Sequence, residues 1–310
     1  MGFDLNNLNA YTEENRMPLF KKAIMTPKTL EYIGVMPDVK SSAAINIISG
    51  DLVGQAGACG WNEDGTTLLT QRTMTVCPLK INEAYCIDDL EAYWTQKQLR
   101  PGSYNEDMGG IEGSFAEFKS EKVAELVENL IWNGSTTGGT GNLALCDGFR
   151  ELLKQEGTYI NGNVSGLTFT LATAIDVVDL MVDQLPADLQ GSEDIVLFMG
   201  LDYFRIYSRA LRDANLYNYP STETGVVSTE MFVPGTGIKV VGLKPLNGTN
   251  EMVLAESTAE GRNLWFGTDL LNDFGTLDMF YDKNDDEVRL RVKWKQGVQV
   301  AFPDQVVYFK

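Results

Sequence analysis

The residues best placed for chemistry in this sequence are carboxylates. Asp88 and Asp89 are adjacent, and Asp176, Asp179 and Asp183 recur at helical spacing. Two carboxylates can share the acid and base steps of glycoside hydrolysis. With 43 acidic residues in the chain, such groupings also arise by chance, and no pair stands apart from the rest. A hydrolase with paired carboxylates is therefore one hypothesis for the function.

The absence of histidine excludes Ser-His-Asp and Cys-His triads, a His-ligated zinc and a His general base. Two further motifs lack a required residue. Residues 135–141 are rich in Gly and Thr, but they lack the Gly-Lys-Ser/Thr ending of a P-loop. Residues 282–286 begin like a calcium loop, but Glu287 and Lys293 occupy the positions of its Gly and its Glu. We expect no catalytic residue, cofactor or metal ion.

The four cysteines are Cys59, Cys77, Cys86 and Cys146. They form no Cys-x-x-Cys pair, so we expect no zinc site. Their number is ordinary for a reducing compartment, so we expect no structural disulfide. Cys59 and Cys77 flank a predicted hairpin, but a turn at residues 62–65 would place residue 59 opposite residue 68 and would not bring the two cysteines together.

The chain is strongly acidic, with 25 Lys and Arg against 43 Asp and Glu, a net charge of −18. Residues 167–286 carry nineteen acidic and seven basic residues, whereas residues 287–310 carry two and five. This charge argues against a general nucleic-acid binder. The hydrophobic share of 44% is that of a globular protein. No apolar run approaches the ~18 residues of a membrane span, so we expect no membrane association.

The clearest predicted helix spans residues 113–133, which carry an apolar stripe at helical spacing. Ser114 is the predicted N-cap, and Glu117 completes a capping box. Gly134 is predicted to end the helix in the left-handed conformation. The stripe consists of Phe115, Phe118, Val123, Leu126, Val127 and Leu130.

The first two segments have little capacity to form a core of their own. Residues 1–49 show weak periodicity, which predicts an extended arm that lies against the body or a neighbouring chain. Residues 50–85 contain Gly and Asn breakers followed by a Thr-rich run, which predicts a β-hairpin. Trp61, near the predicted tip, either folds back on the hairpin or inserts into a partner.

The middle of the chain alternates helix and strand patterns, which predicts an α+β unit over residues 167–265. Its predicted helices cover residues 171–184 and 201–215, and a strand covers residues 194–199 between them. A shorter helix is predicted ahead of this unit, at residues 146–155. These patterns indicate a compact body behind the hairpin.

The end of the chain predicts one long strand. From residue 287 to residue 295 every even position is apolar and every odd position is charged, as in a half-buried strand. The same phase continues beyond Gly297, where a two-residue hairpin would break it. We therefore predict a bend at Gly297, a turn at residues 283–286 and a preceding strand at residues 277–281.

The order of these segments resembles the major capsid proteins of tailed bacteriophages, with the long helix ending in Ile131-Trp132-Asn133-Gly134. The stretch from Cys59-Gly60-Trp61 to Ala92-Tyr93-Trp94 looks like capsid proteins of phages that infect Bacteroidota. The resemblance implies an α+β fold of the Hong Kong 97-like type. Its parts would be an N-terminal arm (1–49), an extended loop (50–85), a peripheral domain with the spine helix 113–133 (86–166), an axial domain (167–265), and return strands of the peripheral domain with the C-terminus (266–310).

The resemblance further implies a structural protein that is not an enzyme. Many copies would form hexamers and pentamers of an icosahedral shell around double-stranded DNA, without sequence-specific binding to it. Portal, scaffold and decoration proteins would be partners, the virion the location, and the host bacterial cytoplasm the place of assembly. The lysine that some members use to cross-link the extended loop is not found between Asp51 and Leu79. The residues expected at contacts between subunits are Trp61, Asp64, Gly65, Arg72, Asp285, Asp286, Arg289 and Arg291.

Two alternatives stay open. An encapsulin-like nanocompartment would share the fold and enclose another cargo, so the DNA content separates it from a phage capsid. The hydrolase with paired carboxylates predicts a monomer or small oligomer with a deep acidic cleft. The basic residues of the terminal strand either meet phosphates or, as we favour, pair with the protein's own acidic surface; they are Arg289, Arg291, Lys293 and Lys295.

Overall fold

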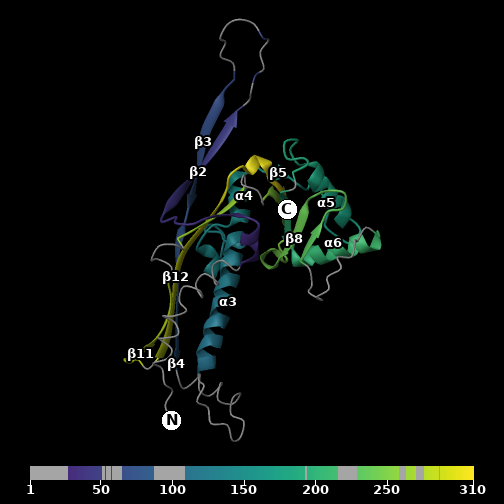
Figure 1. Cartoon of the computed structure of the whole chain (residues 1–310). Coiled ribbons are helices and arrows are strands. Elements are labelled where there is room, and N and C mark those ends of the chain that lie inside the picture. The colour runs from purple at the N-terminus through teal and green to yellow at the C-terminus, as the bar shows by residue number, and fades with distance from the viewer. Residues whose placement is uncertain are drawn as a thin grey trace.

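The computed structural model of the chain is elongated (Figure 1). Helix α3 (Gly109–Asn133) runs along a sheet built around strand β12 (Glu287–Val300), and a compact unit of helices and strands lies on the other side of α3. Strands β2 (Ser42–Gly50) and β3 (Thr67–Thr75) project beyond one end of this body. The structure describes residues 27–50, 53, 57, 65–86, 109–192, 194–215, 229–257, 263–269, 276–285 and 287–310.

Strand β12 organises a five-stranded sheet. One side of it pairs with β4, and the other side pairs first with β11 and then with β10, all antiparallel. Strand β1 joins β10 in parallel. The partners of β12 and the joining strand are β1 (Gly34–Met36), β4 (Cys77–Cys86), β10 (Leu264–Thr268) and β11 (Thr276–Asp282).

The predicted terminal strand is confirmed. Val288, Leu290, Val292 and Trp294 are buried, whereas the residues between them are partly or fully exposed. The strand runs past Gly297 without interruption, and the turn before it leads back to β11. A Cβ at Gly297 would lie 2.2 Å from the carbonyl oxygen of residue 75, so only glycine fits where the two backbones come this close.

Helix α3 begins at Gly109, ahead of the predicted start, so Ser114 lies inside the helix and does not cap it. Val123, Val127 and Leu130 are buried as predicted, but Phe118 is 52% exposed. An α-helix turns by ~100° per residue, which places residue 118 well away from the line of the buried residues. The serine at position 120 occupies that line and is 1% exposed.

Helix α3 ends before Gly134 as predicted, but the reason for the glycine is different. Gly134 follows the helix, but it does not adopt a positive φ. Its Cβ would lie 2.2 Å from the carbonyl oxygen of Cys146. The glycine is therefore required by the close approach of another backbone segment, and a left-handed cap is not involved.

The compact unit contains a six-stranded sheet whose central strand, β6, is buried on both faces. Ile195, Leu197 and Met199 pack with helices α5 and α6, whereas Val196 and Phe198 belong to the core that includes α3. Strands β6 and β8 are parallel neighbours joined through α6. The elements are β5 (Ile160–Asn161), α5 (Ala174–Asp183), β6 (Ile195–Gly200), α6 (Leu201–Asp213), β7 (Glu230–Phe232), β8 (Lys239–Leu243), β9 (Met252–Glu256) and β13 (Val307–Phe309).

The predicted helices and strand of this unit are confirmed in type; α6 begins at the predicted residue 201, whereas β6 and α5 begin later than predicted. Helix α5 begins three residues late because Thr170 and Thr173 form a turn in front of it, in which the hydroxyl of Thr173 donates to the carbonyl of Thr168 at 2.6 Å. The short helix predicted at residues 146–155 is α4. Helix α4 spans Phe149–Glu156. The 3₁₀ helices are η1 (Lys28–Glu31), η2 (Gly141–Ala144), η3 (Lys244–Leu246) and η4 (Pro303–Gln305).

Trp132 lies fully buried at the centre of the larger core. Its ring centroid is 5.4 Å from that of Phe149 and 5.2 Å from that of Phe198. The indole N–H donates to the hydroxyl of Thr29 at 2.8 Å, and that hydroxyl donates to Glu128 at 3.3 Å. The segment of the predicted arm around Thr29 therefore packs on the body of its own chain, whereas its last residues form β2. Of the helices in the described ranges, none is both long and apolar enough to cross a membrane.

Candidate functional site

The hairpin of β2 and β3 stands apart from the body. Its strands pair antiparallel, from Ser42 opposite Thr75 to Gly50 opposite Thr67, and they form a two-stranded sheet of their own. Figure 1 shows this sheet extending away from the remaining elements. A two-stranded sheet is at best marginally stable in water. The hairpin therefore depends on contacts at its base or with another molecule.

The base of the hairpin is anchored in the body by a small apolar cluster. Ile45 from β2, and Met74 and Val76 from β3 and its end, are buried together with Val39 and Ala301. These side chains come from both hairpin strands and from the end of β12. The lower half of the hairpin is thus fixed relative to the five-stranded sheet.

Arg72 adds a polar anchor beside this cluster. Its guanidinium forms two hydrogen bonds with the Glu156 carboxylate, at 2.8 and 3.1 Å, and a third with the carbonyl of Val300 at 3.3 Å. The amide of Gln299 donates to the carbonyl of Thr73 at 2.8 Å. Arg72, expected at a contact between subunits, thus has partners within its own chain, and its use between subunits stays a prediction.

The outer half of the hairpin exposes apolar side chains. Ile48, Leu68 and Leu69 are 71%, 59% and 72% exposed. Ile48 pairs directly with Leu69, so these two side chains lie next to each other on one face. Apolar side chains gathered on one exposed element are typical of a surface that another molecule covers.

The register of the hairpin contradicts the turn predicted at residues 62–65. Leu68 pairs with Ser49 and not with Cys59. The first strand begins at Ser42, because the apolar residues at the end of the predicted arm extend the pairing. Gly65, two residues before β3, has a φ of 116°, which suits glycine. The remaining tip residues of the prediction, Trp61 and Asp64, lie outside the described residues.

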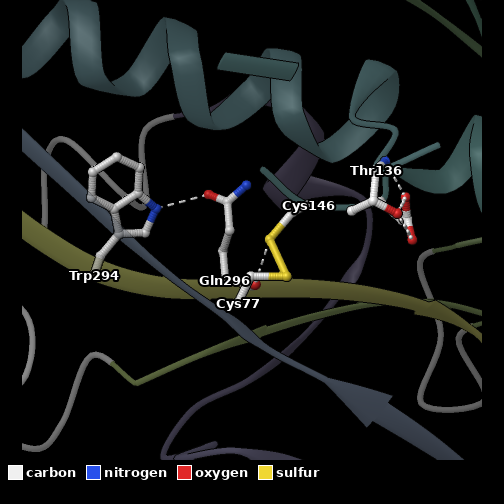
Figure 2. The surroundings of a disulfide bond; sticks show 6 residues. Cys77, Thr136, Cys146, Trp294 and Gln296 are labelled. Carbon is white, nitrogen blue, oxygen red and sulfur yellow. Dashed lines mark hydrogen bonds between the residues drawn. A yellow bond between two sulfur atoms is a disulfide. The ribbon is translucent and has the colours of Figure 1, made fainter. Parts of the chain in front are cut away.

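A disulfide joins Cys77 to Cys146, which contradicts the expectation of free thiols (Figure 2). Cys77 begins β4, and Cys146 is buried between η2 and α4; their Cα atoms are 6.1 Å apart. Beside the bond, the indole N–H of Trp294 donates to the side-chain oxygen of Gln296 at 2.9 Å. The two cysteines are 69 residues apart and meet through tertiary packing, so their pairing cannot be read from the spacing of the cysteines beside the hairpin.

Glu251 forms a nearly buried ionic cluster that links three elements. It accepts hydrogen bonds from Arg150, Lys154 and Tyr308. Burial alone would raise the pKa of this carboxyl, but these hydrogen bonds outweigh burial and hold the pKa at about 2. Arg150 also donates to Asn133 at the end of α3. The cluster therefore ties α3 and α4 to the six-stranded sheet.

The basic side chains of β12 pair mainly with acidic residues of the same chain, as we favoured. Each pair joins β12 to a neighbouring strand, turn or loop, and this leaves their role between subunits a prediction. Asp286 lies outside the described residues. The pairs are Arg289 with Asp282 and Asp285, Arg291 with Asp278 at 2.9 Å, and Lys295 with Asp269 at 3.2 Å.

A hollow of about 310 Å³ beside α3 holds two carboxylates with opposite pKa shifts. Burial raises the pKa of Glu128, whereas hydrogen bonds from Lys244 and Lys122 lower the pKa of Glu125 to about 2. Both carboxylates are engaged, because Glu125 is ion-paired with these lysines and Glu128 accepts from Thr29. In the described ranges no three residues could jointly hold a metal ion. The hollow gives the hydrolase hypothesis no support.

Comparisons with known proteins identify the fold. No family model and no curated protein matches this sequence. Among solved structures, this chain is similar to a chain of the satellite phage P4 procapsid including the size determination protein. The match covers 95% of this chain and 97% of that chain, with a TM-score of 0.57 and 12% sequence identity. A chain of Gordonia phage Cozz is 84% covered and matches 90% of this chain, with a TM-score of 0.57 and 11% identity. This chain has the Hong Kong 97-like capsid fold.

A third similar structure is a virus-like particle from Pyrococcus furiosus. The match covers 97% of this chain and 99% of that chain, with a TM-score of 0.53 and 14% sequence identity. All three matches span nearly the whole chain, so the capsid fold accounts for the body and the hairpin together. Within it, the division into arm, extended loop, peripheral domain and axial domain stays a prediction.

The disulfide predicts a measurable share of the stability. Because it closes a long loop, Cys77→Ser should lower the free energy of unfolding by ~4 kcal/mol. Urea unfolding with and without a thiol reductant checks this, since the reductant should lower the wild-type midpoint to that of the variant. Cys86→Ser, at an exposed free cysteine, is the control and should unfold like the wild type. An unchanged urea midpoint of the wild type after complete reduction of the disulfide would contradict the prediction.

The Glu251 cluster predicts sensitivity to acid. The folded pKa of about 2 lies below the ordinary 4.5, so this carboxylate stabilises the fold above pH 4.5 and loses that effect as the pH falls toward 2. The loss should approach ~3 kcal/mol. Urea unfolding between pH 7 and pH 2.5 measures it. Glu251→Gln should have a lower free energy of unfolding at pH 7 and should lose less of it on acidification. Asp304→Asn, at an exposed position, should show the same dependence of the free energy of unfolding on pH as the wild type. The same pH dependence in all three proteins would disprove the stabilising role of the Glu251 carboxylate.

Proposed function

We propose that this chain is the major capsid protein of a tailed bacteriophage, and that many copies form the hexamers and pentamers of an icosahedral shell around double-stranded DNA. The projecting hairpin carries the proposal. Its outer half exposes Ile48, Leu68 and Leu69 without a third strand among the described residues. In a shell, a neighbouring subunit would cover these side chains. The capsid fold supports this role.

The proposed roles of the segments follow the fold. The hairpin of β2 and β3 would be the extended loop predicted at residues 50–85, although its first strand begins at Ser42 and residues from Cys77 onward form β4 of the five-stranded sheet. Helix α3 would be the spine of the peripheral domain. The unit within residues 167–265 would be the axial domain around the five-fold and six-fold axes. The proposed contact residues remain Trp61, Asp64, Gly65, Arg72, Asp285, Asp286, Arg289 and Arg291.

The charge supports containment of DNA in preference to tight binding. A subunit with a net charge of −18 repels phosphates at long range, which suits a wall that confines a genome. We place the protein in the virion, assembled in the cytoplasm of a bacterial host of the Bacteroidota. Portal, scaffold and decoration proteins would complete the particle.

An encapsulin-like compartment is the second candidate. The similarity to the virus-like particle from Pyrococcus furiosus favours keeping it, because that match covers 97% of this chain. Such a shell would use the same contacts between subunits. Its content would differ, so the content decides between the two candidates.

Electron microscopy and light scattering of the purified chain test the function. We expect closed shells, tubes, or rings of five and six subunits, because the fold leaves the hairpin uncovered in a monomer. Native particles should retain DNA after nuclease treatment. Particles whose protected content is protein would favour the compartment, and a chain that stays monomeric at high concentration, with and without co-expressed neighbours of its gene, would refute a shell function.

The hairpin predicts a defect in assembly that leaves the subunit folded. Ile48→Asp with Leu69→Asp should reduce shell yield at least ~10-fold, since buried apolar anchors dominate protein interfaces. The circular dichroism spectrum should stay unchanged because both side chains are exposed in the subunit. Val164→Asp, at a residue 60% exposed elsewhere, is the matched control. Wild-type yield from the hairpin variant would show that another surface joins the subunits.

A further inference from the structure

Helix α6 carries a row of three arginines. Arg205, Arg209 and Arg212 are exposed, on the side of the helix away from buried Phe204 and Tyr207. Within the described part of the chain they form no ion pair, although acidic residues far outnumber basic ones. Every other arginine in the described ranges is paired with a carboxylate; these are Arg72, Arg150, Arg289 and Arg291.

Helix α5 carries the complementary row. Asp176, Asp179 and Asp183 are exposed, opposite the buried Val178 and Met181, and form no ion pair with the described residues. Burial, and then repulsion from Asp183 and Asp176, raises the pKa of Asp179. No cation of the described chain offsets this repulsion, so the row is a concentrated negative charge left without a partner.

The two rows lie on one layer of the molecule but do not meet. Helices α5 and α6 cover the same face of the six-stranded sheet, where their buried residues share one core (Figure 1). Because they pack on each other and on the sheet through apolar residues, their charged rows face outward. Three carboxylates on one helix and three guanidiniums on the next are thus available to a second copy of the chain.

We propose that Arg205, Arg209 and Arg212 of one copy bind the aspartate row of α5 on the next copy around a ring. The inference rests on the proposed function and names the contact that closes the hexamers and pentamers. In such a contact the arginine row of each copy meets the aspartate row of the next, and a heterologous contact repeated in this way generates closed rings. DNA phosphate is the competing partner for the arginines, but it leaves the aspartate row without one.

Charge reversal tests the contact. One variant carries Arg205→Glu, Arg209→Glu and Arg212→Glu, and a second carries Asp176→Lys, Asp179→Lys and Asp183→Lys. Each should lower the yield of shells at least ~10-fold, because like charges then face each other. A variant with all six changes keeps the net charge of −18 and should recover assembly. Mixing the two triple-substitution variants should also recover rings. These rings should have an even number of subunits, because the two variants must alternate for opposite charges to meet.

The outcomes separate this contact from the shell function. Wild-type yield from either three-fold variant overturns the contact and leaves the shell intact. Folded variants whose combination and mixture both fail to assemble overturn it as well. Shells that form normally but lose DNA only in the arginine variant assign the arginines to phosphate instead. A wild-type chain that forms no shell overturns the function and the contact together.

Discussion

The backbone pairing of strand β12 holds this molecule together. One side of the strand pairs with β4, and the other pairs with β11 and β10, so distant parts of the sequence share one ladder. The pairing satisfies backbone groups that burial would otherwise leave without partners. Only Val76 separates β4 from β3, so the strand that is fixed in this sheet also carries the hairpin beyond the body. The hairpin is therefore held firmly at its base while its outer half has no core.

Strand β6, which is buried on both faces, makes the body rigid, in contrast to the hairpin. The strand is shared by the core around Trp132 and by the core under α5 and α6, which makes the two layers mechanically continuous. The Glu251 cluster and the disulfide add fixed links between α3, α4 and the sheets. A rigid body with an anchored, uncovered extension suits repeated assembly, because each copy offers its neighbours the same surfaces in the same geometry.

Local sequence patterns predicted single elements well and their partners poorly. Strict alternation identified β12, and helical spacing identified α6, because these patterns report which face of an element is buried. Phe118 is apolar and belongs to the predicted stripe, but its angle around the helix places it on the exposed side. The reason for Gly134, the register of Leu68 and the pairing of Cys77 with Cys146 depend on segments far away in the sequence. No local pattern contains that information.

Electrostatics connects the single chain to an assembly. Copies with a net charge of −18 repel one another at long range, so any contact between them needs local complementarity. Exposed ion pairs add little affinity individually, but they fix register and exclude wrong orientations. An acidic row and a basic row on neighbouring helices each need a partner of opposite charge on another copy. They are satisfied when one subunit follows the next in the same direction, and that arrangement closes into a ring.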